Sequence, residues 1–243
     1  MILKALLIIP AYNEEENIEK VVARIDEFKK SRCSGLQLDY VIINDGSTDD
    51  TLQICRKNNF NVVNLIQNLG IGGAVQTGYM YAERYGYDIA VQFDGDGQHD
   101  INSLMPLIEP VIKDEQDFVV GSRFLEGTSE FKSTLMRRIG IRYLSFIIKL
   151  FARCRVTDPT SGFRAANRKV IKYLARNYPV DYPEPESLVD LSKRSFRISE
   201  VQVNMLEREG GMSSISSWKS VYYMVKVSLA IVCSSLQKKT RED

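Results

Sequence analysis

The stretch Ile89-Ala-Val-Gln-Phe-Asp94-Gly-Asp96-Gly-Gln98-His99-Asp100 indicates the fold class of this chain. It opens with an apolar run typical of a buried strand, and two aspartates separated by one glycine follow directly. Open parallel sheets bind their ligands beyond the carboxyl ends of the strands. Asp94 and Asp96 are therefore expected at the ligand-binding edge of an α/β sheet, where Gly95 and Gly97 allow a phosphate to come close.

Other apolar runs lie on both sides of this one, and patterns typical of helices separate them. Such alternation predicts βαβ units, and hence a Rossmann-like, mostly parallel central sheet flanked by helices. The expected strands are Ala5–Ile9, Tyr40–Ile43, Val62–Ile66, Ile89–Phe93 and Phe118–Val120. The expected helices are Glu14–Lys30, a segment after Thr48, Ile71–Arg84 and Ile101–Lys113.

The second half of the chain follows a different pattern. After Ser122 the succession of strands is expected to stop, and a helical pattern runs from Thr134 to about Arg153. A second amphipathic segment, Ser217–Leu236, follows near the end of the chain. No linker rich in proline or glycine marks a second independent domain. We therefore expect one domain over residues 1–243, with one half at 1–122 and the other at 123–243.

The composition is that of a soluble globular chain, with 44% hydrophobic and 26% charged residues among 243. A net charge of +1 lacks the basic excess typical of nucleic-acid-binding proteins, so no nucleic acid partner is expected. The cysteines form no C-x-x-C pair, which favours reduced thiols and a cytoplasmic location. Lys226 interrupts the longest late apolar stretch, Val221–Leu236, which argues against a membrane-spanning helix.

The acidic pair permits two interpretations. Two carboxylates one residue apart can share a divalent cation, and hard oxygen ligands favour Mg²⁺ or Mn²⁺. The other interpretation is an ordinary turn with a solvated acidic tip. An EF-hand loop starting at Asp94 is excluded, because its glycine position falls on His99 and its glutamate position on Met105. His99 is the only histidine, and we expect it to have a structural role or to position Asp96.

Three further segments stand at the ends of expected strands: Pro10-Ala-Tyr-Asn-Glu14, Asn44-Asp45-Gly-Ser-Thr-Asp49 and Asn68-Leu-Gly70-Ile-Gly72-Gly73-Ala. Together with the acidic pair, their order and spacing resemble glycosyltransferase family 2 of the GT-A fold, over about residues 5–165. A nicotinamide-binding domain is disfavoured, because Val75 occupies the last position of the pattern G-x-G-x-x-G.

The resemblance implies an inverting, metal-dependent transferase whose donor is a UDP- or GDP-sugar. It implies that Asp45 contacts the base or ribose, that Asp94 lies near the ribose and diphosphate, and that Asp96 is the principal ligand of Mg²⁺ or Mn²⁺. Residues 1–122 would then bind the nucleotide-sugar, and 123–243 would face the acceptor. The residues expected at the donor are Pro10, Ala11, Tyr12, Asn13, Glu14, Asp45, Asn68, Gly70, Gly73, Gln92, Asp94, Gly95 and Asp96.

The helical pattern after Thr134 is strongly basic and amphipathic. Arg138, Arg142, Lys149 and Arg153 form a narrow stripe at helical spacing beside a wide apolar face. Such a helix can lie at the surface of an anionic membrane, or it can pack on the core with its basic side in water. The apolar face comprises Ile139, Tyr143, Leu144, Phe146, Ile147, Leu150 and Phe151.

Within the family, four segments resemble the dolichyl- or polyprenyl-phosphate sugar synthases: Gly121-Ser-Arg123-Phe, Arg137-Arg138, Asp158-Pro-Thr-Ser161-Gly162-Phe163-Arg164 and Arg208-Glu-Gly-Gly-Met-Ser213. A phosphate acceptor is largely dianionic at neutral pH and needs no general base. It needs cations, and a guanidinium binds phosphate oxygens in bidentate fashion. The candidates to hold the acceptor are Arg123, Arg138 and Arg208, with Gln98 and Ser213.

The sequence departs from those synthases in two ways. No obvious pair of C-terminal transmembrane helices is present, and Tyr182-Pro-Glu184-Pro-Glu186 follows the Gly162 segment. Glu184 or Glu186 could act as the base that a sugar hydroxyl acceptor requires, or these residues could cap a helix. We include Glu186 with Asp94, Asp96 and Arg123 as catalytic candidates. A hydroxyl acceptor would be a sugar on a lipid-linked or surface glycan.

The expected partners follow from these features. Besides the donor and a lipid-phosphate acceptor, we expect a membrane surface, with the protein peripheral at the cytoplasmic face. A second copy of the chain or a membrane protein is a further candidate partner. The competing class is a membrane-associated nucleotide-sugar-binding protein without activity. A dead transferase would more often have lost Asp96 or Arg123, and both are present.

Overall fold

The computed structural model describes residues 2–32, 35–125, 135–206 and 217–236, and it contains a seven-stranded sheet of order β3-β2-β1-β4-β6-β5-β7. β1, β2, β3 and β4 pair in parallel, and β5 pairs in parallel with β7. β6 lies between β4 and β5 and is antiparallel to both. The strands are β1 Leu3–Ala11, β2 Leu36–Asn44, β3 Val62–Asn64, β4 Ile89–Gln92, β5 Phe118–Ser122, β6 Arg164–Asn167 and β7 Ile198–Gln202.

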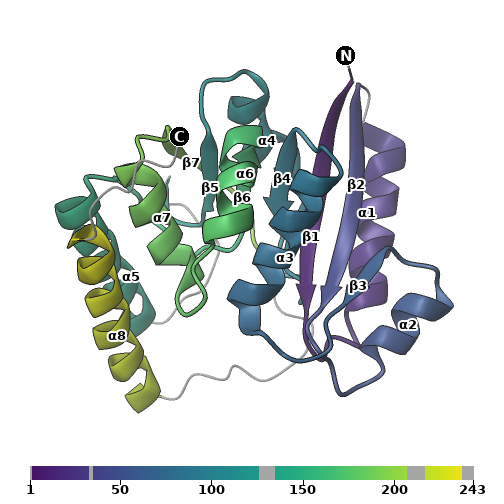
Figure 1. Ribbon diagram of the computed structural model, residues 1–243, viewed down its shortest axis with the longest axis horizontal. Helices are drawn as coiled ribbons and strands as arrows, with labels where there is room; N and C mark the ends of the chain where they lie inside the picture. Colours follow the sequence, from purple (N-terminus) through teal and green to yellow (C-terminus); the bar gives the residue numbers. More distant parts are fainter. Residues whose placement is uncertain (1, 33–34, 126–134, 207–216, 237–243) are drawn as a thin grey trace.

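Helices cover both faces of the sheet, so the molecule has three layers (Figure 1). Leu6 and Ile8 of β1 face a core formed with α3, α6 and the α5–α7–α8 group, whereas Leu7 and Ile9 face a core formed with α1 and α4. This alternation of side chains is the ordinary consequence of strand geometry. The helices are α1 Ile18–Arg32, α2 Thr51–Lys57, α3 Gly70–Arg84, α4 Leu104–Ile112, α5 Leu135–Ala152, α6 Arg168–Asn177, α7 Pro183–Lys193 and α8 Ser217–Leu236.

The α/β architecture predicted from the sequence is confirmed, and each of the five expected strands is present. The expectation that strand formation stops after Ser122 is wrong, because β6 and β7 complete the sheet. β6 is the four-residue run Arg-Ala-Ala-Asn, and β7 is a half-buried edge strand, Ile-Ser-Glu-Val-Gln. Neither has the continuous apolar character by which a buried parallel strand is recognised.

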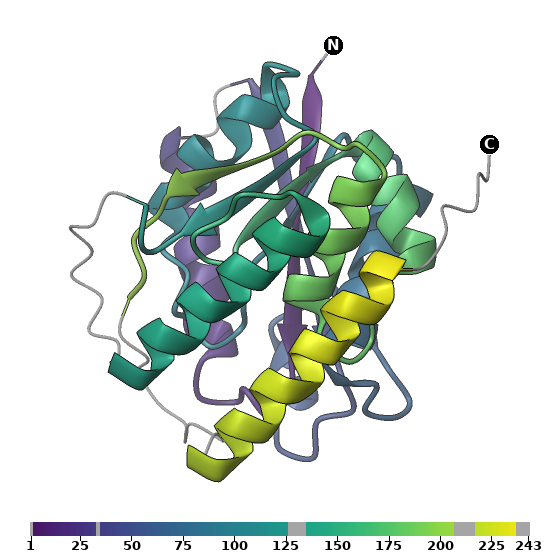
Figure 2. The ribbon, with the colours of Figure 1, turned by 90° about the vertical axis from the view of Figure 1, so that its left-hand side faces the viewer.

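The amphipathic helices α5 and α8 lie side by side at one end of the sheet (Figures 1 and 2). α5 buries Ile141, Leu144 and Ile148 against the core, and α8 buries Val227 and Ile231. Most of the apolar face predicted for α5 remains in solvent, because the core takes a different stripe of the helix. In the parts of the chain that the structure describes, no helix combines the length and the hydropathy needed to cross a bilayer.

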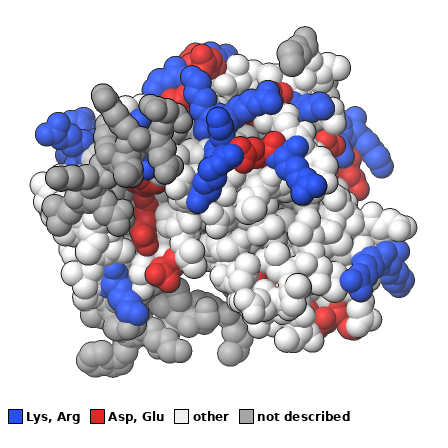
Figure 3. All heavy atoms as spheres, viewed as in Figure 1, with Lys and Arg blue, Asp and Glu red and all other residues white. Residues whose placement is uncertain are grey.

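The surface carries mixed charge. On the face drawn in Figure 3, basic and acidic side chains are interspersed among the described residues, without an extended area of one sign. On this face the mixed distribution accords with a net charge of +1.

The packing of α3 against β1 depends on Gly78. A methyl group at this position would lie 2.1 Å from Cγ2 of Ile8, which is far inside van der Waals contact. The close approach lets α3 pack directly on β1.

We expect Gly78→Ala to lower the free energy of unfolding by about 1–3 kcal/mol, because the added methyl group overpacks the contact between α3 and β1. Gly140→Ala is the matched control, since a methyl group there would lie 3.5 Å from the sulfur of Met224, an ordinary contact. In a helix interior this second change should be neutral or stabilise by up to about 1 kcal/mol. Urea denaturation of both variants measures the difference, and equal stabilities would contradict the prediction.

Candidate functional site

The ends of β1, β2 and β4 meet at one edge of the sheet. Parallel pairing places Ala11 opposite Asn44 and Ile8 opposite Gln92, so the residues that follow each strand share this edge. They enclose a pocket of about 500 Å³, which we call the strand-end pocket. Its lining residues are Pro10, Ala11, Tyr12, Glu14, Asp45, Asn68, Gly70, Ile71, Ala74, Gln92, Asp94, Gly95, Asp96, Thr160, Gly162 and Glu184.

The structure brings together all of the residues predicted for the donor except Asn13 and Gly73. Asn13 has a left-handed backbone, and its Oδ1 accepts the amide of Thr48 at 2.9 Å, so it ties the β1 loop to the β2 loop. Gly73 faces Leu69 within the first turn of α3, where a methyl group would lie 2.4 Å from the Cβ of that leucine. Both residues shape the walls of the pocket without lining it.

Asp45 is held at the bottom of the pocket by backbone contacts. Its Oδ1 accepts the amide of Leu69 at 2.7 Å, and its own amide donates to the carbonyl of Ala11 at 2.9 Å. Burial raises the pKa of Asp45, while the hydrogen bonds from the amides of Leu69 and Gly70 act in the opposite direction. The carboxylate is thereby fixed next to the start of α3.

The two aspartates of the acidic turn line the same pocket. Oδ1 of Asp96 accepts the amide of Gln98 at 3.0 Å, and Oδ1 of Asp94 lies 3.4 Å from Nε2 of Gln92. A carboxylate offers about four lone-pair sites, so it can accept hydrogen bonds and bind a cation at the same time. Among the described residues no group of three or more His, Cys, Asp or Glu is arranged around a metal position. A cation here would therefore take its other ligands from phosphate or water.

His99 contacts the acidic turn through both nitrogens of its ring. Its Nδ1 accepts the amide of Asp94 at 2.9 Å, its Nε2 lies 3.4 Å from Oδ2 of Asp94, and its ring stacks on Phe163. Burial lowers the pKa of His99 to about 3, an effect that Asp96 opposes and Arg123 reinforces. The imidazole is therefore neutral at physiological pH, and both nitrogens serve to orient the turn, the structural role expected for His99.

Glu184 at the start of α7 enters the pocket opposite the acidic turn. Gln92 links it to the rest of the site, because the Gln92 side chain bonds to Glu184, accepts the Tyr178 hydroxyl at 3.3 Å and approaches Asp94. Burial raises the pKa of Glu184, the charge of Asp94 adds to the increase, and Arg164 opposes it.

Of the two glutamates considered from the sequence, Glu184 lines the pocket and Glu186 does not. Glu186 lies two residues further along α7, about 200° round the helix from Glu184, and its amide donates to the carbonyl of Tyr182. The geometry therefore gives no support to Glu186 as a base and places Glu184 where a base could act. Both glutamates lie in the first turn of α7, which begins at Pro183.

Sequence reasoning also missed four lining residues, Ile71, Ala74, Thr160 and Gly162. The last two belong to the Asp158 to Arg164 segment, one of the four by which the sequence resembles the polyprenyl-phosphate sugar synthases. A methyl group at Gly162 would lie 2.9 Å from Nε2 of Gln92 and 3.0 Å from Oδ2 of Asp94. Only glycine allows this segment to approach the acidic turn so closely.

Arg123 forms a buried ion pair. Its Nε and Nη2 donate to the two carboxylate oxygens of Asp158 at 2.6 and 2.7 Å, and Nη2 also donates to Thr160 at 3.1 Å. The Arg123 side chain is 6% exposed and that of Asp158 is fully buried. These contacts favour a role in holding the 157–162 segment, and direct binding of an acceptor by Arg123 stays a prediction.

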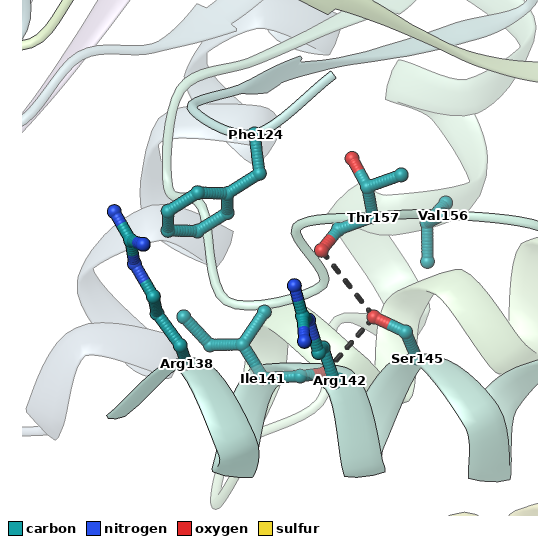
Figure 4. Close-up of a pocket in the computed structure, with 7 residues that line it drawn as sticks. All are labelled: Phe124, Arg138, Ile141, Arg142, Ser145, Val156 and Thr157. Atoms are coloured by element: carbon teal, nitrogen blue, oxygen red, sulfur yellow. Dashed lines mark hydrogen bonds between the residues drawn. The ribbon is translucent and has the colours of Figure 1, made fainter. Parts of the chain in front are cut away.

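A second pocket, of about 340 Å³, lies between α5 and the chain that leads from α5 to β6 (Figure 4). Arg138 and Arg142 project from the same side of α5 toward Phe124, with Ile141 between them. We call this the basic pocket. Its lining residues are Phe124, Arg138, Ile141, Arg142, Ser145, Val156 and Thr157.

The remaining acceptor candidates are distributed differently. Gln98 lines neither pocket, and its backbone carbonyl accepts the amide of Leu206 at 2.8 Å. Arg208 and Ser213 lie outside the described residues. Of the predicted acceptor residues that the structure describes, only Arg138 lines the basic pocket, and Arg142 joins it there.

Comparison with known proteins decides the family. The family model described as Glycosyl transferase family 2 matches residues 6–174. The chain belongs to this family. It is therefore a glycosyltransferase, as its motifs at the strand ends predict, and the resemblance stated from the sequence is confirmed.

Two relatives of this glycosyltransferase are similar to it over most of its length. A UDP-N-acetylglucosamine–dolichyl-phosphate N-acetylglucosaminyltransferase of Methanococcus voltae is 36% identical over 227 residues, which cover 85% of this chain and 87% of the relative. A polyprenol monophosphomannose synthase of Mycolicibacterium smegmatis is 28% identical over 238 residues, covering 92% of this chain and 85% of the relative.

Solved structures confirm the GT-A fold. Glucosyl-3-phosphoglycerate synthase from Mycobacterium tuberculosis, in complex with Mn²⁺, uridine diphosphate and glucosyl-3-phosphoglycerate, matches this glycosyltransferase with a TM-score of 0.67. The match covers 98% of this chain and 81% of that chain at 19% identity, so the likeness concerns the fold alone.

Proposed function

We propose that this glycosyltransferase moves a sugar, with inversion, from a nucleotide-sugar to a polyprenyl phosphate at a membrane surface. The observation that carries the proposal is the basic pocket, in which Arg138 and Arg142 face an apolar wall on a helix whose outer side is also apolar. Cations beside apolar surface suit a phosphate with a hydrocarbon chain. The names of the Methanococcus and Mycolicibacterium relatives give the same acceptor class.

The strand-end pocket is the proposed donor site. Asp45 faces the nucleoside, and Asp94 and Asp96 would hold Mg²⁺ or Mn²⁺ against the diphosphate. The fit rests on two carboxylates lining one pocket beside Gly95, where a methyl group would lie 2.9 Å from the carbonyl of Pro10. When bound, the cation would act as a Lewis acid that neutralises charge on the departing nucleoside diphosphate.

The residues of the chain perform the rest of the proposed reaction. An acceptor phosphate oxygen attacks the anomeric carbon while the bond from that carbon to the diphosphate breaks on the opposite side, which inverts the configuration. Because the acceptor phosphate is largely dianionic near neutral pH, no proton has to be removed. Arg138 and Arg142 would bind the acceptor phosphate, and Gln92 would hold Asp94 and Glu184 in register around the sugar.

The exposed side of α5 supports a membrane location. Ile139, Tyr143, Phe146 and Leu150 recur at helical spacing, and each is at least 44% exposed. Leu229 of the adjacent α8 is also 60% exposed. The basic stripe of α5 adjoins its apolar side, as in helices that lie in the headgroup region of anionic bilayers.

A second candidate function rests on Glu184. A sugar hydroxyl acceptor requires a base, and a half-buried carboxylate of raised pKa in the donor pocket suits that role. In this alternative the acceptor is a sugar on a lipid-linked or surface glycan. With a phosphate acceptor, Glu184 would instead contact hydroxyl groups of the donor sugar.

We expect Asp96→Asn to weaken Mn²⁺-dependent binding of UDP about tenfold or more, because one charged ligand of the cation is lost. Asp100→Asn is the matched control, since the Asp100 side chain caps the turn at Ile101–Ser103 and does not line the pocket. Calorimetric titration of UDP with and without Mn²⁺ measures both. Unchanged Mn²⁺-dependent affinity in Asp96→Asn would remove the basis for the metal site.

We expect the purified chain with Mn²⁺ to transfer sugar from one of a panel of UDP- and GDP-sugars to a short-chain polyprenyl phosphate. Arg142→Gln should raise the acceptor KM more than about tenfold, because a charge-assisted hydrogen bond contributes about 1.5–3 kcal/mol. Lys149→Gln, on the same basic stripe but outside the pocket, should leave the KM unchanged. Transfer only to a polyprenyl-diphosphate-linked sugar, abolished by Glu184→Gln, would establish the second candidate instead.

We expect the chain to bind anionic vesicles weakly and reversibly. Leu150→Ser should reduce the partition coefficient about tenfold, because burial of one such side chain contributes about 1.5–3 kcal/mol. Met80→Ser is the control, because Met80 is similarly exposed, at 55% against 60% for Leu150, but lies on α3. Sedimentation with phosphatidylglycerol vesicles measures binding. Equal sedimentation with and without vesicles would refute the membrane location.

A further inference from the structure

The strand-end pocket and the basic pocket share one wall. The chain from α5 to β6 contributes Val156 and Thr157 to the basic pocket and Thr160 and Gly162 to the strand-end pocket. This short segment, 156–162, belongs to no helix or strand. Its position must therefore be set by contacts with side chains outside it.

The inner part of the segment is held by Arg164. This fully buried side chain donates to the carbonyl of Pro159 at 2.8 Å and to that of Ser161 at 2.6 Å. The middle is held by the ion pair of Asp158 with Arg123, which also places the hydroxyl of Thr160. These contacts fix the part that lines the strand-end pocket.

The outer part is held by Glu200 of β7. Its Oε2 accepts the amide of Thr157 at 2.6 Å, and its Oε1 accepts the amide of Asp158 at 2.9 Å and the hydroxyl of Thr157 at 3.2 Å. One carboxylate thus binds two consecutive amides. β7 pairs with β5 so that Glu200 lies opposite Val120, three residues before Arg123. The edge strand therefore positions the acceptor side of the segment.

We propose that Glu200 is a positioning residue for the transfer reaction, which holds Thr157 and Asp158 so that the 156–162 segment walls both pockets at once. The inference rests on the proposed function, because it assigns the basic pocket to the acceptor. Glu200 itself lines neither pocket. It acts through Thr157 on the basic pocket, whereas Arg164 fixes the part of the segment that lines the strand-end pocket.

Glu200→Gln tests this role, because glutamine has the same shape but only one acceptor oxygen. One of the two amides then faces an amide NH₂ group and loses its acceptor. The acceptor KM should rise about tenfold, in line with the loss of a hydrogen bond to a charged group. Arg164 still holds the donor side, so the dissociation constant of UDP with Mn²⁺ should change less than about twofold.

Hydrogen exchange gives a readout that does not require turnover. The amides of Thr157 and Asp158 should exchange faster in Glu200→Gln than in the wild-type chain, and those around Asp45 should not. Glu83→Gln is the control, because it removes an ion pair with Arg176, of 2.8 Å, that lies on α3 and α6 outside both pockets. It should alter neither acceptor KM nor exchange in the segment.

Two outcomes would overturn the proposal. One is unchanged protection of the Thr157 and Asp158 amides in Glu200→Gln. The other is an equal loss of acceptor and nucleotide binding, which indicates general destabilisation. If the wild-type chain transfers sugar to no acceptor, the proposed function fails separately, and faster exchange of these two amides with unchanged UDP binding would still support the positioning role.

Discussion

The buried guanidinium of Arg164 is the constraint on which the completed site depends. A charge in the interior is tolerated only when its donors are satisfied. Arg164 meets this condition through the carbonyls of Pro159, Ser161 and Glu184 and the hydroxyl of Ser187. One side chain therefore binds two segments, one at Pro159–Ser161 and one at Glu184–Ser187. These segments contribute Thr160, Gly162 and Glu184 to the strand-end pocket.

The nucleotide side of the site could be predicted from sequence because local rules determine it. A parallel strand ends where its apolar run ends, and the polar residues that follow must lie at one edge of the sheet. Asp45, Asp94 and Asp96 are each placed by this rule, and each lines the pocket. The side chains that close the pocket were harder to predict, because Glu184 and Thr160 arrive through the contacts of Arg164, which no local pattern reveals.

The difference between local patterns and long-range contacts also explains which predictions from the sequence were wrong. β6 begins with Arg164, a residue that an apolar strand pattern rejects, yet its charge is buried by long-range hydrogen bonds. β7 lies at an edge and alternates weakly, so nothing in Ile198–Gln202 distinguishes it from a loop. For α5 the helix itself was predictable, but which apolar stripe meets the core depends on α7 and α8. The core takes Ile141 and Leu144 and leaves Phe146 outside.

The α5 helix has three stripes of side chains: one buried, one apolar and exposed, and one basic. This arrangement suits the chemistry that the proposed reaction requires. A nucleotide-sugar stays in water, whereas a polyprenyl phosphate exposes only its headgroup at the bilayer surface. The buried stripe anchors the helix, Phe146 and Leu150 face outward, and Arg142 lies between these two stripes at the basic pocket. In this arrangement the phosphate would lie at headgroup depth, and the 156–162 segment would border both the phosphate and the donor. Control of that segment is then control of the distance between the two reacting groups, and a shift of about 1 Å there is enough to slow transfer severely.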